Sequence, residues 1–182
     1  MSFELFRAAT DYARDVTSGL ASDALRLPTP CDGWDTGAVV LHLADVAAAL
    51  GGLIKTGELQ MPDSPGADAT DPVAIFHGSL GELLDTLSAA GDSERAHAAM
   101  RAGTIEFTTH GWDIAVASNH GHRIPEQLAG DVLGLATSLI SDHERGTNFA
   151  ARVDAPTTVP MSDRLTAFLG RQPAGPGVGR RP

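Results

Sequence analysis

Residues 101–119 read RAGTIEFTTHGWDIAVASN, and this stretch is the most informative part of the chain. Its large apolar side chains recur at helical spacing, but they cover a wide arc of the helix instead of a narrow stripe. Such a pattern is typical of a helix that is buried on several sides. The side chains that form the arc are Ile105, Phe107, Trp112 and Val116.

Four other segments repeat apolar residues every three or four positions and predict further helices. A capping residue, a proline in the first turn or a terminal glycine marks several of their ends. The inward positions are Phe3, Phe6, Ala9, Ala13, Val16 and Leu20 in a helix ending near Ala24; Val39, Leu43, Val46, Leu50 and Leu53 in a helix capped by Asp35; Val73, Phe76, Leu80, Leu83 and Leu87 in a helix ended by Gly91; and Leu128, Val132, Leu135 and Leu139 in a helix from Pro125 to Gly146.

The remaining segments follow a different pattern. Proline, glycine and aspartate dominate Gly57–Asp71, which we predict to be a mobile linker. A short helix is expected at Ser162–Leu169, and Val153–Val159 has the character of an extended segment. Residues 172–182 are rich in Pro, Gly and Arg without periodicity and predict a disordered tail.

Length and composition predict one all-α domain. A chain of 182 residues is the usual size of a single domain. Apolar residues make up 42% of it but aromatic residues only 5%, and alanine and leucine dominate, a mixture that favours helices over strands. We therefore predict an up-and-down four-helix bundle with an additional short C-terminal helix over residues 1–171, followed by the tail at residues 172–182.

Charge and cysteine content restrict the partners and the compartment. The net charge of -10 argues against nucleic acid and anionic membranes, because no basic cluster is available to displace counterions. The apolar stretch Val39–Leu53 is shorter than the ~20 residues that span a bilayer, and His42 and Asp45 interrupt it. Cys31 is the single cysteine, and the N-terminus resembles no signal peptide. We expect a reduced, cytoplasmic protein without a membrane segment.

Glu106 and His110 provide the first candidate site. They are four positions apart, so their side chains lie on one helix face, about 5 to 6 Å apart, where both can bind one cation. A third ligand must come from elsewhere, and His42, beside the apolar stripe of another helix, is the natural donor. Three protein ligands leave a coordination position free for water, thiol or substrate. Asp113, on the same face as His110, could orient an imidazole from behind.

The spacing alone also fits a simpler interpretation. In this interpretation Glu106 and His110 form only a solvated pair, and His42 is a hydrogen-bonded core residue. Helix-end or surface roles account for the other histidines, which are His77, His97, His120, His122 and His143.

Cys31 and the two tryptophans offer weaker candidates. A thiol near a helix start can act as a nucleophile, but no histidine neighbours Cys31 as a base, so a small apolar turn residue is the preferred interpretation. Trp34 and Trp112 could line a substrate pocket, although anchoring the core is the commoner role in a small bundle.

Several motifs together resemble one family. The chain is similar to actinobacterial members of the DinB/YfiT-like superfamily, and more closely to the metal-binding branch related to the N-terminal domain of mycothiol-dependent maleylpyruvate isomerase. The resemblance extends over residues 3 to 173. The motifs that carry it are Thr29–Trp34, Leu41–Leu43, Glu106 with His110–Asp113, Asp163–Leu165 and Phe168–Arg171.

The resemblance implies a four-helix bundle with a metal, zinc or nickel, near its mouth. His42, Glu106 and His110 match the ligand positions of the family, and its active members commonly use mycothiol or bacillithiol. The short stretch Gly91–Arg95 departs from a longer family segment that can border the substrate site, so the resemblance does not extend to the substrate.

Three functional hypotheses follow. The first is a metal-dependent enzyme that uses a mycothiol-type thiol in transfer or isomerisation of a small molecule. The second is a thiol-independent isomerase, cyclase or lyase that uses the metal as a Lewis acid. The third is a bundle that binds a metal or ligand without catalysis. The sequence is compatible with a monomer or a homodimer.

Overall fold

The computed structural model describes residues 3–61, 70–119, 121, 123–141, 143, 145 and 149–172. This part of the chain is all-helical and contains no β-strand, which confirms the predicted fold class. Val153–Val159 is therefore not a strand. The helices are α1 (Phe3–Ser18), the 3-10 helix η1 (Ala24–Arg26), α2 (Thr36–Thr56), α3 (Pro72–Ala90), α4 (Glu94–Ala117), α5 (Glu126–Leu139) and α6 (Met161–Phe168).

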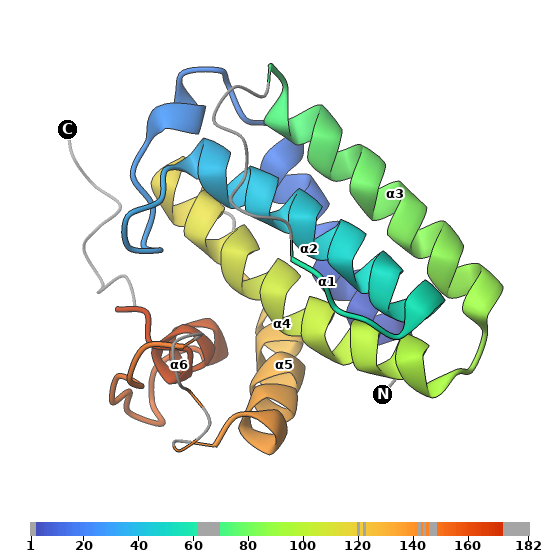
Figure 1. Cartoon of the computed structure of the whole chain (residues 1–182). Helices are drawn as coiled ribbons and strands as arrows, with labels where there is room; N and C mark the ends of the chain where they lie inside the picture. The colour runs from blue at the N-terminus through green and yellow to red at the C-terminus, as the bar shows by residue number, and fades with distance from the viewer. Residues whose placement is uncertain are drawn as a thin grey trace.

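Helices α1 to α4 form the bundle, and α5 and α6 pack together beside it (Figure 1). The directions of the four long helices do not simply alternate. The C-terminal ends of α2 and α3 lie together, since Ile54 and Lys55 line the same surface hollow as Ala89 and Ala90. Helices α2 and α3 thus run in one direction and α1 and α4 in the other (Figure 1). The connection from Gly57 to Asp71, of which residues 62–69 lie outside the described part of the chain, has enough residues for this arrangement, because an extended chain advances about twice as far per residue as a helix does.

Side-chain caps define where the helices begin. The carboxylates of Asp35 and Asp71 accept hydrogen bonds from the backbone N–H groups of Ala38 and Ala74, and the Ser93 hydroxyl accepts from Ala96. These caps satisfy donors that have no partner inside the helix. The Ser93 cap starts α4 seven residues before the predicted Arg101, so the last two residues of the short stretch Gly91–Arg95 belong to this helix.

Two helices end earlier in the chain than the sequence predicted. Helix α1 ends at Ser18, before Gly19, whose helix propensity is low, and only the short η1 follows near Ala24. Helix α5 ends at Leu139, because Ile140 adopts an extended backbone that places its side chain in the core. Gly146, the predicted end of α5, lies outside the described residues.

The core confirms most of the predicted inward positions. Phe6, Phe76 and Phe107 are fully buried, and Phe107 packs against both of the others at ring-centre distances of 6.0 and 6.1 Å. This aromatic cluster joins α1, α3 and α4. Phe3 and Leu139, which the periodicity placed inward, are 50% and 45% exposed because they lie at helix ends.

Helix α4 lies close to α1 at Gly111. A Cβ atom built on Gly111 would be 2.9 Å from Cε1 of Tyr12, which is closer than carbon atoms normally approach. Gly111 thus lets the backbones of α1 and α4 come together immediately beside His110.

Helix α2 differs from the expectation in length. Its 21 residues make it long and apolar enough to cross a membrane by length and composition alone. However, 56% of its most apolar stretch is buried inside the bundle, and a core helix passes the same test.

Replacing Phe107 by alanine tests the aromatic cluster. We expect Phe107→Ala to lower the free energy of unfolding by about 3 to 5 kcal/mol, because a fully buried ring is removed and leaves a cavity. Phe3→Ala is the matched control and should change it by less than about 0.5 kcal/mol. Urea unfolding measures both values, and equal losses would contradict the assignment of the core.

Candidate metal centre

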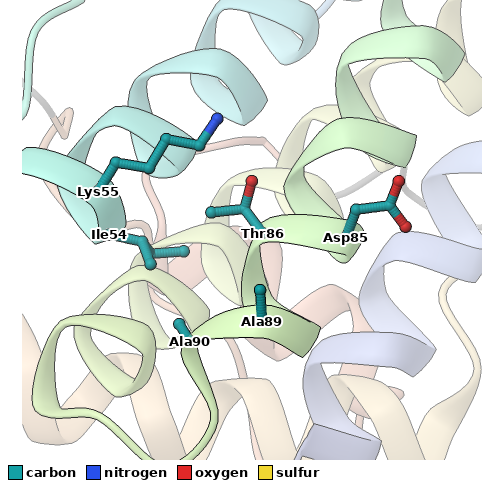
Figure 2. Close-up of a pocket in the computed structure, with 6 residues that line it drawn as sticks. All are labelled: Ile54, Lys55, Asp85, Thr86, Ala89 and Ala90. Atoms are coloured by element: carbon teal, nitrogen blue, oxygen red, sulfur yellow. The ribbon is translucent and has the colours of Figure 1, made fainter.

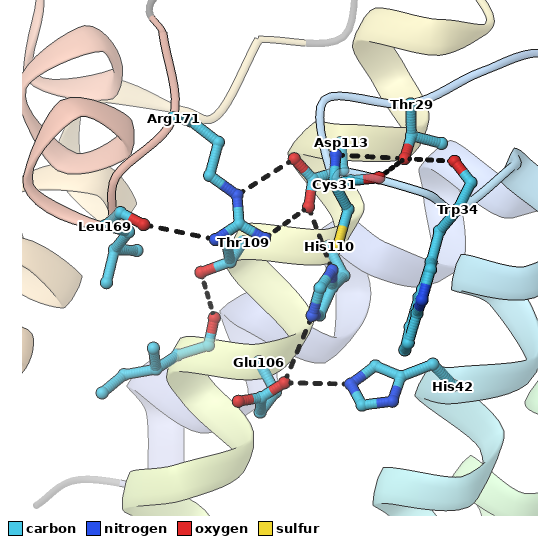
Figure 3. Close-up of polar contacts among 11 residues, drawn as sticks. Thr29, Cys31, Trp34, His42, Glu106, Thr109, His110, Asp113, Leu169 and Arg171 are labelled. Carbon is cyan, nitrogen blue, oxygen red and sulfur yellow. Dashed lines mark hydrogen bonds and ion pairs between the residues drawn. The ribbon is translucent and has the colours of Figure 1, made fainter. Parts of the chain in front are cut away.

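Helices α2 and α4 bring His42, Glu106 and His110 together (Figure 3). Oε2 of Glu106 lies 3.3 Å from Nε2 of His42 and 3.4 Å from Nε2 of His110. The two imidazole rings meet edge to face, with their centres 4.8 Å apart. Two ring nitrogens and one carboxylate oxygen from two helices therefore face a common point. The Glu106 side chain remains 30% exposed, so the group is open on one side.

Asp113 contacts the opposite edge of the His110 ring. Its Oδ2 atom lies 3.0 Å from Nδ1 of His110, and its side chain is fully buried. A carboxylate at this position favours a proton on Nδ1, which leaves Nε2 to face Glu106. Arg171, from the segment after α6, donates to both oxygens of Asp113.

Trp34 and Cys31 come from the loop before α2 and cover the same group. The Trp34 ring contacts His42 edge to face at 4.9 Å and lies nearly parallel to the His110 ring at 6.3 Å. Thr29 holds this loop, because its hydroxyl donates to the carbonyl oxygen of Trp34 and accepts from the N–H of Cys31. Trp34 is half-buried, so it is a wall of the site, whereas Trp112 is a core residue, as predicted.

Hydrogen bonds between the side chains favour the charged forms of Glu106 and His110 when no metal is bound. Burial opposes the charge of Glu106, but hydrogen bonds with His110 and His42 outweigh it and hold the pKa of Glu106 well below its usual value. Burial also opposes the charge of His110, but Asp113 and Glu106 raise its pKa to about 9. A proton therefore occupies the position where a cation would bind.

The surroundings make Cys31 a poor nucleophile. Burial and the negative charge of Asp113 raise the pKa of the thiol, and the positive charge of Arg171 only partly opposes them. A thiol with a raised pKa has little of the reactive thiolate at neutral pH. The raised pKa agrees with the interpretation of Cys31 as a small turn residue, although its position close to His110 and Asp113 was not predicted.

Two sets of three donors could hold a metal among the described residues. One is His42, Glu106 and His110, and the other is Cys31, His110 and Asp113; within each set the donor atoms lie within 4.8 Å of one another. Asp113 already binds Arg171 and His110, whereas Glu106 is partly exposed and contacts both imidazoles. Both sets contain ligand types that zinc accepts, but Asp113 is enclosed and already paired, and the thiol of Cys31 has a raised pKa, so the first set fits a divalent metal better.

The other predicted histidine roles have mixed outcomes. His77 is half-buried and not simply solvent-facing, because its Nε2 atom lies 2.9 Å from the hydroxyl of Thr17 on α1. His97 is also half-buried and pairs with Asp92 at 2.7 Å. His143 is exposed. His120 and His122, predicted near the end of α4, lie outside the described residues.

Sequence reasoning missed the role of Arg171, and for Trp34 it preferred a core role over the pocket-lining alternative. The Gly170–Arg171 pair indicates a helix end but carries no sign of its partner, 58 residues away. Trp34 had a local signal, because a residue directly before an N-cap often packs back on its own helix.

A separate hollow lies between the C-terminal parts of α2 and α3 (Figure 2). It measures about 480 Å³ and is open to solvent. Ile54 is twelve residues beyond His42, or ~18 Å along α2, so the hollow is remote from the donor atoms. Its lining contains no histidine or cysteine and consists of Ile54, Lys55, Asp85, Thr86, Ala89 and Ala90.

Comparison with known proteins identifies similar sequences. The sequence profile of the mycothiol maleylpyruvate isomerase N-terminal domain matches residues 6–115. Two uncharacterized proteins of Mycobacterium tuberculosis, MT0763 of strain CDC 1551 / Oshkosh and Rv0738 of strain ATCC 25618 / H37Rv, are each 27% identical to the chain over 177 residues. Each alignment covers 90% of this chain and 93% of the relative. No solved structure matches significantly.

Metal content tests the choice between the donor sets. Protein purified without added metal or a histidine tag should carry about one zinc or nickel ion per chain, measured by plasma mass spectrometry. His42→Ala should lose the metal because it removes one ligand, while Cys31→Ser should retain it. The reverse result would move the centre to Cys31, His110 and Asp113.

The raised pKa of His110 predicts a pH-dependent stability of the metal-free protein. Between pH 6.5 and about 9, folded His110 keeps a proton that the unfolded chain has lost. The free energy of unfolding should therefore fall as the pH rises through this range. Urea unfolding in the presence of a chelator measures it, and His110→Gln should lack this part of the fall. A wild-type profile identical to that of His110→Gln would contradict the charged imidazole.

Proposed function

Because the chain belongs to the mycothiol maleylpyruvate isomerase N-terminal domain family, a group of DinB-like helical domains associated with mycothiol, we propose that it is a metal-dependent enzyme acting on a small molecule. It would use a mycothiol-type thiol in a transfer or isomerisation reaction. His42, Glu106 and His110 would hold a divalent zinc or nickel ion through Nε2, Oε2 and Nε2 respectively.

The convergence of these three side chains is the observation that carries the proposal. Their donor atoms come from two packed helices and lie within 4.8 Å of one another. Three donors on one side of the centre leave another side for a further ligand, as in catalytic and unlike structural zinc sites. A bound metal supplies Lewis acidity, which lowers the pKa of a thiol or water that reaches it.

The protein's own side chains prepare the centre. Asp113 accepts from Nδ1 of His110 and so turns Nε2 toward Glu106. The ring of Trp34 lies against both imidazoles and restricts the access of water from the loop side. The 30% exposure of Glu106 marks the side from which a small molecule can enter.

An external thiol suits this site better than Cys31. The raised pKa of Cys31 and its position in a Thr29-held turn make it a weak nucleophile. Thiol chemistry at this centre therefore requires a thiol brought by a small molecule, which agrees with the mycothiol association of the family.

Thiol binding and thiol transfer test the proposal separately. We expect zinc-loaded protein to bind mycothiol in isothermal titration calorimetry, and His42→Ala to lose this binding with the metal. The loaded protein should also accelerate the transfer of mycothiol to monochlorobimane, in which the sulfur displaces chloride. Cys31→Ser should retain both properties.

Each failure has a distinct meaning. Metal binding without mycothiol binding would remove the thiol and favour the thiol-independent Lewis-acid hypothesis. Mycothiol binding without transfer would leave a ligand-binding bundle as the better account. Folded protein that binds neither zinc nor nickel would overturn the metal centre itself.

A further inference from the structure

We infer that Arg171 is a positioning residue of the metal centre: it holds Asp113, and Asp113 holds the imidazole of His110. This inference rests on the proposed function, because it assigns to Arg171 the task of preparing His110 as a ligand. Arg171 follows α6 and lies outside residues 6–115, the region that the family profile matches. The C-terminal segment would therefore complete a centre whose donors all belong to the bundle.

The guanidinium of Arg171 is committed to contacts within the protein (Figure 3). Its Nη2 donates to Oδ2 of Asp113 at 2.9 Å and its Nε donates to Oδ1 at 3.3 Å, so the interaction with the carboxylate is bidentate. Its Nη1 donates to the carbonyl oxygen of Leu169 at 3.2 Å. All three nitrogens thus have an acceptor, and the side chain is only 12% exposed. This arrangement suits a residue that fixes the position of Asp113 rather than one that binds substrate.

The end of α6 directs Arg171 toward α4. The N–H of Gly170 donates to Ala167 and the N–H of Arg171 to Thr166, the pair of bonds that closes a Schellman motif. Gly170 has a φ of 84°, and a Cβ atom there would be 2.8 Å from Cβ of Ala150, so only glycine fits the turn. The buried side chain of Leu169 anchors the same turn in the core.

The grip on Asp113 restricts His110. Oδ2 of Asp113 contacts both Nη2 of Arg171 and Nδ1 of His110, at 2.9 and 3.0 Å. With both oxygens held, the carboxylate cannot rotate away from the ring. Arg171 also contributes a second positive partner to Asp113, which is fully buried and contacts His110 on its other side. The orientation of Nε2 toward Glu106 and His42 therefore depends on a residue beyond the bundle.

Zinc affinity in three variants tests this inference. Arg171→Gln should weaken zinc binding by about 10- to 100-fold, the usual cost of losing a partner behind a metal ligand. Arg171→Lys keeps the charge but cannot form the bidentate pair with Asp113, so its zinc affinity should lie between those of the wild type and Arg171→Gln. Arg164→Gln is the matched control in α6, because Arg164 contacts Met161 of its own helix and should leave zinc affinity unchanged. Competition with a chromophoric chelator measures all of them.

A second measurement on the metal-free protein separates positioning from folding and from the proposed function. Nitrogen NMR shifts of His110 report the protonation and hydrogen bonding of its two ring nitrogens. They should change in Arg171→Gln and stay as in the wild type in Arg164→Gln, with both variants still folded by circular dichroism. If the wild type bound no zinc while these shifts changed, the metal proposal would fail and the positioning role would stand. Unchanged shifts in Arg171→Gln, or wild-type zinc affinity, would overturn the inference.

Discussion

The carboxylate of Asp113 is fully buried on a helix that packs against α1, α2 and α5, and a buried charge must be paired. His110 pairs it from one side and Arg171 from the other. This requirement connects three parts of the fold: the central helix α4, the segment after α6, and, through His110 and Glu106, helix α2. The polar centre is therefore part of the tertiary packing and not an addition to a finished core.

The directions of the helices bring the parts of the centre together. Helix α2 runs opposite to α4, which brings His42, in the second turn of α2, level with Glu106 in the later half of α4. The loop before α2 then reaches the same end of the bundle, where Trp34 lies on both imidazoles. Helix α3 runs parallel to α2, and its end contributes to the remote hollow instead of the centre.

The centre is prepared for a cation even without one. Glu106 and Asp113 keep a proton on His110 by raising its pKa to about 9, so a metal must displace that proton in order to bind. This competition means that metal affinity should increase with pH. The two carboxylates occupy different positions around His110. Glu106 is partly exposed beside the donor nitrogens, whereas Asp113 is enclosed behind the ring.

The sequence by itself determined the local features of this protein. Periodicity predicted the helices and most buried positions, and the four-residue spacing of Glu106 and His110 predicted that both side chains lie on one face, because helical geometry relates residues that are near in sequence. That a metal occupies the site stays a prediction. The parallel course of α2 and α3, the position of Trp34 against both imidazoles and the grip of Arg171 on Asp113 were decided only by the tertiary structure. Arg171 and Asp113 are 58 residues apart, and no periodicity relates such a pair, since the energy of burying and pairing charges depends on how the whole chain packs.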